Sequence, residues 1–252
     1  MHEQFHPDFS DKKEIVRNFV AHFKTEGKLL ADGKRNKIKI FDADGFRYNI
    51  KSFKVPNLLN QFIYGFIRPS KAKRSFEYAN KLLENGFGTP QPVAYFENRN
   101  GLLKDSYYVS EQLECDLTFR ELTTDRKYPD HEIILRQFTR FTFDLHEKNI
   151  EFLDHTPGNT LIRKIREKQY AFFLVDLNRM NFRPLSFDDR LKNMARLTPE
   201  TDLVRVMADE YSKLSQHSFE ETFSKMTKFS LAFRDRFHRK RRIKKQLKFW
   251  KK

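Results

Sequence analysis

Asp154-His155-Thr156-Pro157-Gly158-Asn159 is the stretch of this 252-residue sequence that decides the fold. The Pro-Gly-Asn run favours a tight turn, so the segment predicts a polar loop that presents a carboxylate and an amide. A hairpin over residues 160–165 and 170–177 follows, and it carries Asp176 at its end. Carboxylate and amide oxygens are the ligands that Mg²⁺ prefers, with phosphates and water completing its shell. Taken alone, the hexapeptide is equally compatible with a structural turn.

The first half of the chain predicts a mixed lobe. Its expected elements are a helix, a three-stranded meander, a second helix and two more strands, over residues 10–23, 29–53, 71–85, 93–97 and 106–113. Ser70 is suited to cap the second helix and Gly86 to end it. After residue 113 the pattern is mainly helical, with a long helix expected from an Asp130 cap to His146.

Polar residues of the two halves form an ordered set. Lys51 lies in the third strand of the meander, and Glu77 lies in the helix that follows. Asp154, Asn159 and Asp176 come later, in that order. A strand lysine, a helix glutamate, two loop residues and a final aspartate are the parts of a phosphoryl-transfer site. Lys54 and Glu84 remain alternatives to Lys51 and Glu77.

With this set, residues 25–215 resemble the protein-kinase-like fold, and most closely the lipopolysaccharide kinases of the Kdo/WaaP family. The most similar stretches are Leu145-His146-Glu147-Lys148-Asn149-Ile150 and Phe173-Leu174-Val175-Asp176. The resemblance implies an α+β, two-lobed fold, with a small antiparallel-sheet N-lobe and a mainly helical C-lobe. The expected boundaries are 1–113 for the N-lobe, 114–232 for the C-lobe and 233–252 for a basic tail.

The resemblance also implies how ATP is held. Lys51 would contact the α and β phosphates and form an ion pair with Glu77. The backbone around Glu111 and Leu113 would hydrogen-bond adenine. Gly33 is one of two glycines near the expected phosphate loop, which lacks the Gly-x-Gly-x-x-Gly pattern of protein kinases.

Three residues carry the implied chemistry. Asp154 would orient the acceptor hydroxyl and take its proton, while Asn159 and Asp176 would bind Mg²⁺. His146 is expected to pack behind the loop. An Asp-Leu-Asn run replaces Asp-Phe-Gly at Asp176, and Thr156 stands where protein kinases have a lysine. These departures favour a kinase for a small substrate over a regulated protein kinase.

The net charge of +15 is concentrated at one end of the chain. Residues 234–252 contain 11 bases and one acid, whereas the rest of the chain is only mildly basic. Apolar residues at Ile243, Leu247 and Trp250 suit a basic amphipathic helix on an anionic membrane surface. Nucleic acid is a less favoured partner, and a solvated end is the third alternative.

Composition excludes several other classes. One cysteine, Cys115, allows no intrachain disulfide and no cysteine-rich zinc site. The polar residues 1–14 do not resemble a secretory signal, and no apolar run approaches a bilayer span. We therefore expect a cytoplasmic protein.

Together these features predict a kinase that uses ATP and Mg²⁺ to phosphorylate a Kdo or heptose hydroxyl of the lipopolysaccharide inner core. The acceptor would be lipid-anchored, and the enzyme would work peripherally on the inner face of the inner membrane. Two alternatives stay open: an atypical RIO-like protein kinase on a ribonucleoprotein, or a pseudokinase that binds nucleotide or lipid without turnover.

Overall fold

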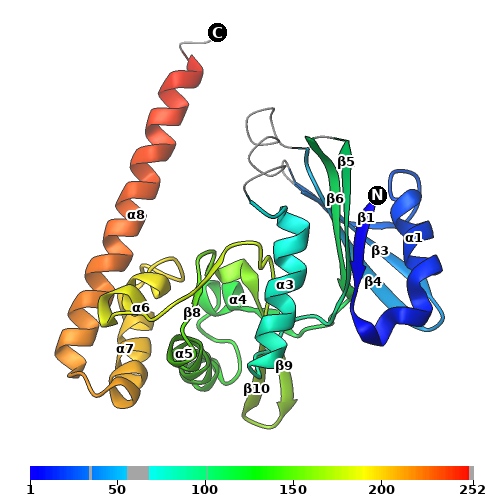
Figure 1. The fold of residues 1–252 in the computed structure, drawn as a ribbon. Helices are drawn as coiled ribbons and strands as arrows, with labels where there is room; N and C mark the ends of the chain where they lie inside the picture. The colour runs from blue at the N-terminus through cyan, green and yellow to red at the C-terminus, as the bar shows by residue number, and fades with distance from the viewer. Residues whose placement is uncertain (34–35, 56–67, 101, 250–252) are drawn as a thin grey trace. The chain divides into compact units, whose positions relative to one another are not determined.

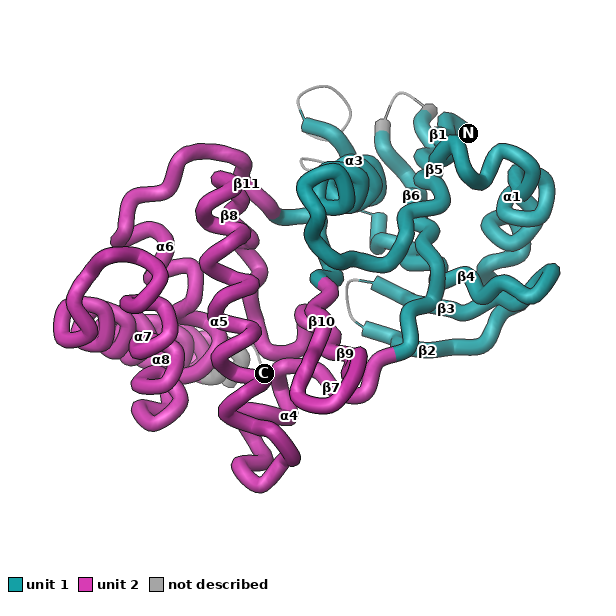
Figure 2. Tube along the Cα trace, turned by 90° about the horizontal axis from the view of Figure 1, so that it is seen from below, with its two compact units in different colours: residues 1–114, 174–179 teal, residues 115–173, 180–252 magenta. Residues whose placement is uncertain are grey.

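The protein is described here by a computed structural model that covers residues 1–33, 36–55, 68–100 and 102–249. Figure 2 shows the two compact units of the chain. Unit 1 comprises residues 1–114 and 174–179, and unit 2 comprises residues 115–173 and 180–252. Trp250, in the basic tail, lies outside the described residues.

Unit 1 is built on a six-stranded antiparallel sheet of order β1-β5-β6-β4-β3-β2. Its strands are β1 (His2–Phe5), β2 (Lys28–Asp32), β3 (Asn36–Ala43), β4 (Phe46–Phe53), β5 (Pro92–Asn100) and β6 (Leu102–Glu111). The β3–β4 turn has positive φ at both Asp44 and Gly45, as a type I′ hairpin requires. The predicted meander is therefore present, and β1 is a strand that the sequence pattern did not predict.

Helices cover both faces of this sheet, as Figure 1 shows. On one face η1 (Pro7–Lys12) and α1 (Lys13–Ala21) pack with Tyr48 and Ile50 of β4. On the other, α3 (Lys71–Glu84) packs with Phe53. Because side chains alternate along a strand, Lys51 shares the α3 face with Phe53.

The ends of α3 are as the sequence predicts. The Ser70 hydroxyl accepts a hydrogen bond from the Lys73 N–H at 3.1 Å, which satisfies one of the orphan donors of the first turn. After the helix, Gly86 adopts a φ of +80°, which a glycine accommodates without a Cβ clash.

Unit 2 is mainly helical. Its helices are α4 (Phe119–Thr124), α5 (His131–Glu147), η2 (Pro157–Asn159), α6 (Phe187–Met194), α7 (Thr201–Ser215) and α8 (Phe219–Phe249). Its strands form two small sheets: β7 (Leu117–Thr118), β9 (Thr160–Arg166) and β10 (Gln169–Leu174) in one, and β8 (Ile150–Phe152) and β11 (Met180–Phe182) in the other. One apolar core, with Phe138 and Tyr211 among its largest buried residues, joins α4, α5, α6, α7 and the three-stranded sheet.

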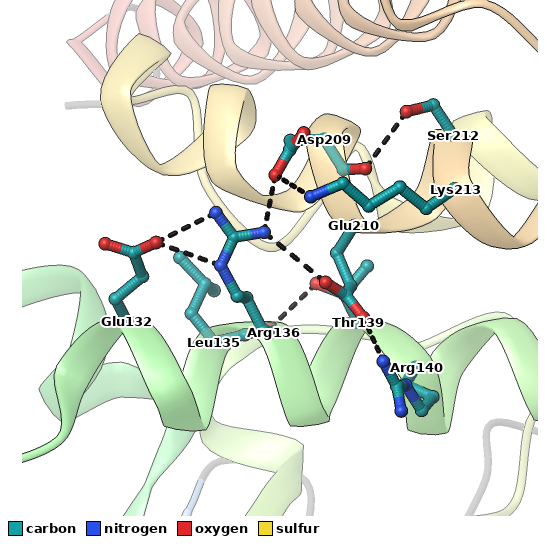
Figure 3. A network of polar contacts seen from close by, with 9 residues as sticks. All are labelled: Glu132, Leu135, Arg136, Thr139, Arg140, Asp209, Glu210, Ser212 and Lys213. Carbon is teal, nitrogen blue, oxygen red and sulfur yellow. Dashed lines mark hydrogen bonds and ion pairs between the residues drawn. The ribbon is translucent and has the colours of Figure 1, made fainter.

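An ion-pair network joins α5 to α7 (Figure 3). Arg136 donates to Glu132, to Asp209 at 2.6 Å and to Glu210 at 3.3 Å. Arg140 donates to the second oxygen of Glu210 at 2.6 Å. Glu210 is buried, and its ion pairs with the two arginines offset the cost of burying its carboxylate.

The start of α5 differs from the prediction. Asp130 adopts a φ of +58° and makes no side-chain cap hydrogen bond. Its carboxylate accepts a hydrogen bond from the Tyr170 hydroxyl at 2.8 Å instead. The predicted Asp130 cap is therefore wrong, because this carboxylate ties α5 to the hairpin of β9 and β10.

Helix α8 has two different halves. Its first half packs on α6 and α7 and buries Met226 and Ser230. Every side chain of residues 234–244 is exposed, including Phe237 and Ile243, so the basic residues surround the helix. Figure 1 shows this second half extending past α6 and α7. Among the described residues no helix is both long and apolar enough to cross a membrane.

Candidate active site

The strand lysine and the aspartate after the hairpin meet in unit 1. Lys51 Nζ donates to Asp176 Oδ1 at 2.6 Å, although 125 residues separate them in the chain. The lysine side chain is only 12% exposed, and its ammonium lies 5.4 Å from the ring centroid of Phe53. Its charge is thus held in a shielded place, where a second anion would meet little competing solvent.

Asp176 is fixed by its neighbour and by its backbone. Asn178 Nδ2 also donates to Asp176 Oδ1, at 2.6 Å, and Asn178 is buried. The φ of Asp176 is +62°, a left-handed conformation that costs a non-glycine residue about 1–3 kcal/mol unless local hydrogen bonds support it. Backbone conformations of this kind are common at functional sites. In this conformation the Asp176 carboxylate contacts Lys51.

Glu77 has a different partner from the expected one. In the described residues its carboxylate lies 3.7 Å from Lys73 Nζ, one helical turn back on α3. Lys51 pairs with Asp176. The structure therefore brings Lys51 together with Asp176 and leaves Glu77 in a partly exposed pair on the helix.

The predicted adenine contacts lie at the end of β6. The Glu111 N–H donates to Gln91 O at 2.9 Å, and the Gln112 N–H donates to Arg47 O at 2.8 Å. The Leu113 N–H has no such backbone partner among the described residues. Burial raises the pKa of the Glu111 carboxyl.

The predicted phosphate-loop glycine sits in the turn between β2 and β3. The Gly33 N–H donates to Asn36 O at 2.9 Å, which closes this turn. An added Cβ would lie 3.3 Å from the same Asn36 oxygen, which is tighter than most real contacts. Gly33 thus has a packing reason of its own to be a glycine.

In unit 2, the loop before β9 brings Asp154 and Asn159 together. Asn159 Nδ2 donates to the Asp154 backbone carbonyl at 2.8 Å, and the Thr156 N–H donates to the same oxygen at 2.7 Å. The Asn159 N–H in turn donates to Thr156 O at 2.9 Å, within η2. The loop is therefore a closed turn, and Asn159 keeps its side-chain oxygen, the atom suited to Mg²⁺, out of that hydrogen bond.

Arg196 lies against the same loop. Its Nη1 donates to Leu153 O at 2.5 Å and to Asp154 Oδ1 at 3.0 Å. The Asp154 side chain is 18% exposed. The carboxylate is thus reachable from solvent but held on one oxygen by a guanidinium.

Two buried histidines support the loop from behind. His146 contacts the Tyr211 hydroxyl at 2.9 Å and Asn193 Oδ1 at 3.2 Å, and burial lowers its pKa to about 3. The His155 ring lies 5.4 Å from the Phe138 ring, and burial lowers its pKa to about 4. Both imidazoles are neutral at pH 7, and His146 packs behind the loop as the sequence predicts.

No three His, Cys, Asp or Glu side chains form a metal-binding group within the described residues. A magnesium site needs fewer protein ligands, because phosphates and water complete its shell. The Asp176 carboxylate of unit 1 and the Asn159 amide of unit 2 each offer an oxygen of the kind that Mg²⁺ prefers.

Two residues of the site went unnoticed in the sequence. From the sequence, Asn178 is only a difference from the Asp-Phe-Gly pattern. An amide two residues after an aspartate can donate a hydrogen bond to the aspartate side chain, and Asn178 does so. Arg196 follows Asp154 by 42 residues, and nothing in its local sequence marks it. Its contact depends on how α6 and the loop fold together.

Comparisons with known proteins identify a family and a similar fold. The model of the lipopolysaccharide kinase (Kdo/WaaP) family matches residues 49–224, a range that holds Lys51, Glu77, Asp154, Asn159 and Asp176. No curated protein sequence matches the chain.

Among solved structures, one described as WaaP in complex with acyl carrier protein is similar in fold. It aligns with a TM-score of 0.65 and 17% identity, over 95% of this chain and 99% of that one. The predicted α+β, two-lobed kinase-like fold is thereby confirmed.

Proposed function

Because the chain belongs to the lipopolysaccharide kinase (Kdo/WaaP) family, a family of phosphotransferases, we propose that it transfers the γ-phosphoryl group of ATP to a Kdo or heptose hydroxyl of the lipopolysaccharide inner core. The observation that carries this proposal is the Lys51–Asp176 contact of 2.6 Å. Two residues from separate predicted motifs meet there, with the charges that a nucleotide and its metal require.

Lys51 binds the nucleotide phosphates in this proposal. Its ammonium now faces Asp176, and the phosphate oxygens of ATP offer it a second set of anionic acceptors. The Leu113 N–H hydrogen-bonds the adenine base. Asp176 and Asn159 are the residues that would bind Mg²⁺, which would neutralise charge on the phosphates. Glu77 serves as a second anion for Lys51 if the lysine leaves Asp176, and Gly33 lies in the loop that covers the phosphates.

Asp154 acts on the acceptor. Its carboxylate accepts the hydrogen bond of the sugar hydroxyl and takes the proton as the hydroxyl oxygen bonds to the γ-phosphorus. The bond from that phosphorus to the β–γ bridging oxygen breaks, and ADP leaves. General-base help of this kind contributes about 10²–10⁴ in rate, so most of the remaining acceleration rests on positioning and charge.

In this proposal the basic second half of α8 binds the protein to the membrane. Each basic residue near an anionic membrane surface contributes about 1 kcal/mol of binding free energy. The exposed side chains of Phe237 and Ile243 add apolar contact with the membrane. The enzyme would then work on the cytoplasmic face of the inner membrane, where a lipid-anchored acceptor is held. Because the similar WaaP structure contains acyl carrier protein, that protein is a second partner to test.

The deciding experiment measures phosphate transfer with purified protein, ATP, Mg²⁺ and a Kdo-bearing lipid A acceptor, read by mass spectrometry of the lipid. Wild type is expected to phosphorylate it, and Asp154→Asn and Asp176→Asn are expected to lose at least about 100-fold in rate. Glu84→Gln, on the exposed end of α3, is the control that keeps activity. Equal background transfer by all four proteins, with heptosylated lipid A also tried, would contradict the proposal.

A further inference from the structure

Arg196 joins the loop of Asp154 to helix α8. Arg196 lies in the segment between α6 and α7. Its Nη1 donates hydrogen bonds to Leu153 O at 2.5 Å and to Asp154 Oδ1 at 3.0 Å. One guanidinium therefore holds the backbone just before the aspartate and one oxygen of its carboxylate. Two contacts from one rigid, planar group restrict both the position and the rotation of that carboxylate.

The guanidinium is itself fixed from α8. Its Cζ lies 5.3 Å from the ring centroid of Phe233, a cation–π distance. Phe233 lies at the end of the packed half of α8, directly before the exposed residues 234–244. The partly buried Phe233 ring thus contacts the group that holds Asp154.

Two neighbouring cations make the same kind of stack without the loop contact. Arg205 lies 4.5 Å from the Phe223 ring, and Lys192 lies 5.2 Å from the Phe229 ring. Within the part of the chain that the structure describes, neither has a hydrogen bond to residues 152–159. Of these three cations, Arg196 is the one that both stacks on an α8 ring and contacts the loop. Arg205 stacks in the same way without the loop contact, so it is a matched control.

One atom of the Arg196 guanidinium has no partner within the described part of the chain. Its Nε is buried and makes no hydrogen bond among the described residues. The polar contacts of the group that hold the loop are therefore those of Nη1, to Leu153 O and to Asp154 Oδ1.

We propose that Arg196 is the positioning residue for Asp154, and that Phe233 of α8 sets Arg196 in place. The inference rests on the proposed kinase activity, because it assigns Asp154 the acceptor hydroxyl. Arg196 acts through Asp154 and not on the nucleotide, so its loss is expected to lower kcat and to leave the KM for ATP nearly unchanged.

The test compares Arg196→Ala, Arg196→Lys and Phe233→Ala with Arg205→Ala and Phe223→Ala. Arg196→Ala is expected to lose about 10–100-fold in kcat, since a misplacement of about 1 Å can cost this much. Arg196→Lys should recover part of the kcat lost in Arg196→Ala. The kcat of Phe233→Ala should lie between those of Arg196→Ala and wild type. The two control variants should keep wild-type kcat at a temperature well below the melting point of each of the five variants.

Chemical rescue separates positioning from general damage. Guanidinium chloride, well below concentrations that unfold the protein, should partly restore Arg196→Ala, whereas sodium chloride at equal ionic strength should not. A wild-type kcat in Arg196→Ala, or equal losses in Arg196→Ala and Arg205→Ala, would overturn the inference.

Hydrogen exchange tests the same contact without any turnover. Residues 152–159 should exchange faster in Arg196→Ala and Phe233→Ala than in wild type, and at the wild-type rate in Arg205→Ala. If wild type fails to phosphorylate any acceptor, the proposed function fails while exchange still decides whether Arg196 holds the loop. Unchanged exchange in Arg196→Ala contradicts that role.

Discussion

Lys51 and Asp176 share a hydrogen bond of 2.6 Å within unit 1, where Asn178 donates to the same aspartate oxygen. The lysine comes from the β4 strand and the aspartate from the segment after β10. This contact ties the segment 174–179 to the sheet, and it distinguishes Lys51 from the alternative lysine at position 54.

Replacing Lys51 should impair nucleotide use. Lys51→Met is expected to lower kcat/KM for ATP by about 100-fold or more, because a shielded cation that stabilises phosphate charge is removed. Lys54→Met, at an exposed position one residue past β4, should retain activity. Steady-state kinetics with varied ATP checks both, and an equal loss in the two variants would refute the choice of Lys51.

The basic half of α8 should direct the protein to anionic membranes. Replacing the four bases of residues 239–242 with glutamine is expected to weaken vesicle binding by roughly 100-fold or more, at about 1 kcal/mol per base. The control changes four exposed bases of the β9–β10 hairpin to glutamine: Arg163, Lys164, Arg166 and Lys168.

Co-sedimentation with phosphatidylglycerol vesicles, neutral vesicles, RNA and acyl carrier protein separates the possible partners. Binding to anionic vesicles that falls with added salt is the expected result. Preference for RNA at matched ionic strength would favour the ribonucleoprotein alternative, and preference for acyl carrier protein would make residues 239–242 a protein interface.

Acid should destabilise the protein through its two buried histidines. The folded-state pKa is about 3 for His146 and about 4 for His155, against about 6.5 unfolded. Below pH ~6.5 the unfolded chain takes up protons that the folded chain refuses, so stability is lost as pH falls toward 4. Each histidine contributes a slope of up to about 1.4 kcal/mol per pH unit.

Urea unfolding at a series of pH values between neutrality and pH 5 measures this slope. His155→Gln should reduce the slope by roughly half of the part that the two buried histidines contribute. A slope that is the same in wild type and His155→Gln would contradict the assignment.

The α5–α7 network should contribute measurably to stability. Arg136→Ala removes contacts to Glu132, Asp209 and Glu210, and it leaves the buried Glu210 with Arg140 alone. We expect a loss of about 1–2 kcal/mol, discounted for the partial exposure of the arginine. Lys213→Ala, which removes an exposed pair with Asp209, should cost less than about 0.5 kcal/mol. Chemical denaturation compares the two.

Local pattern was enough for most elements of the fold. The period-2 alternation placed β4 at Phe46–Phe53, and the Ser70 cap placed the start of α3. It could not reveal β1, a four-residue strand whose pairing with β5 joins segments about 90 residues apart. It also misjudged Asp130, because a cap preference is weaker than the long-range hydrogen bond from Tyr170.

The candidate site was predictable in type and less so in contacts. Chain order alone pointed to Lys51, Asp154, Asn159 and Asp176, since each chemical role needs a particular residue type. Pairing is decided by packing, which no local pattern encodes. Glu77 therefore lies with Lys73, and Arg196 reaches Asp154 from a segment without any motif.

The unbroken course of α8 keeps two electrostatic environments apart. At 1.5 Å per residue, Lys244 lies about 16 Å along the axis from Phe233, twice the screening length of about 8 Å at physiological ionic strength. The charge of Lys244 is therefore largely screened from the Arg196–Asp154 pair, whereas the charges of Arg234 and Arg236, within about 5 Å of Phe233 along the axis, are not. A long-range attraction can thus be tuned by mutation in the outer turns without shifting the balance of charge around the reacting phosphate.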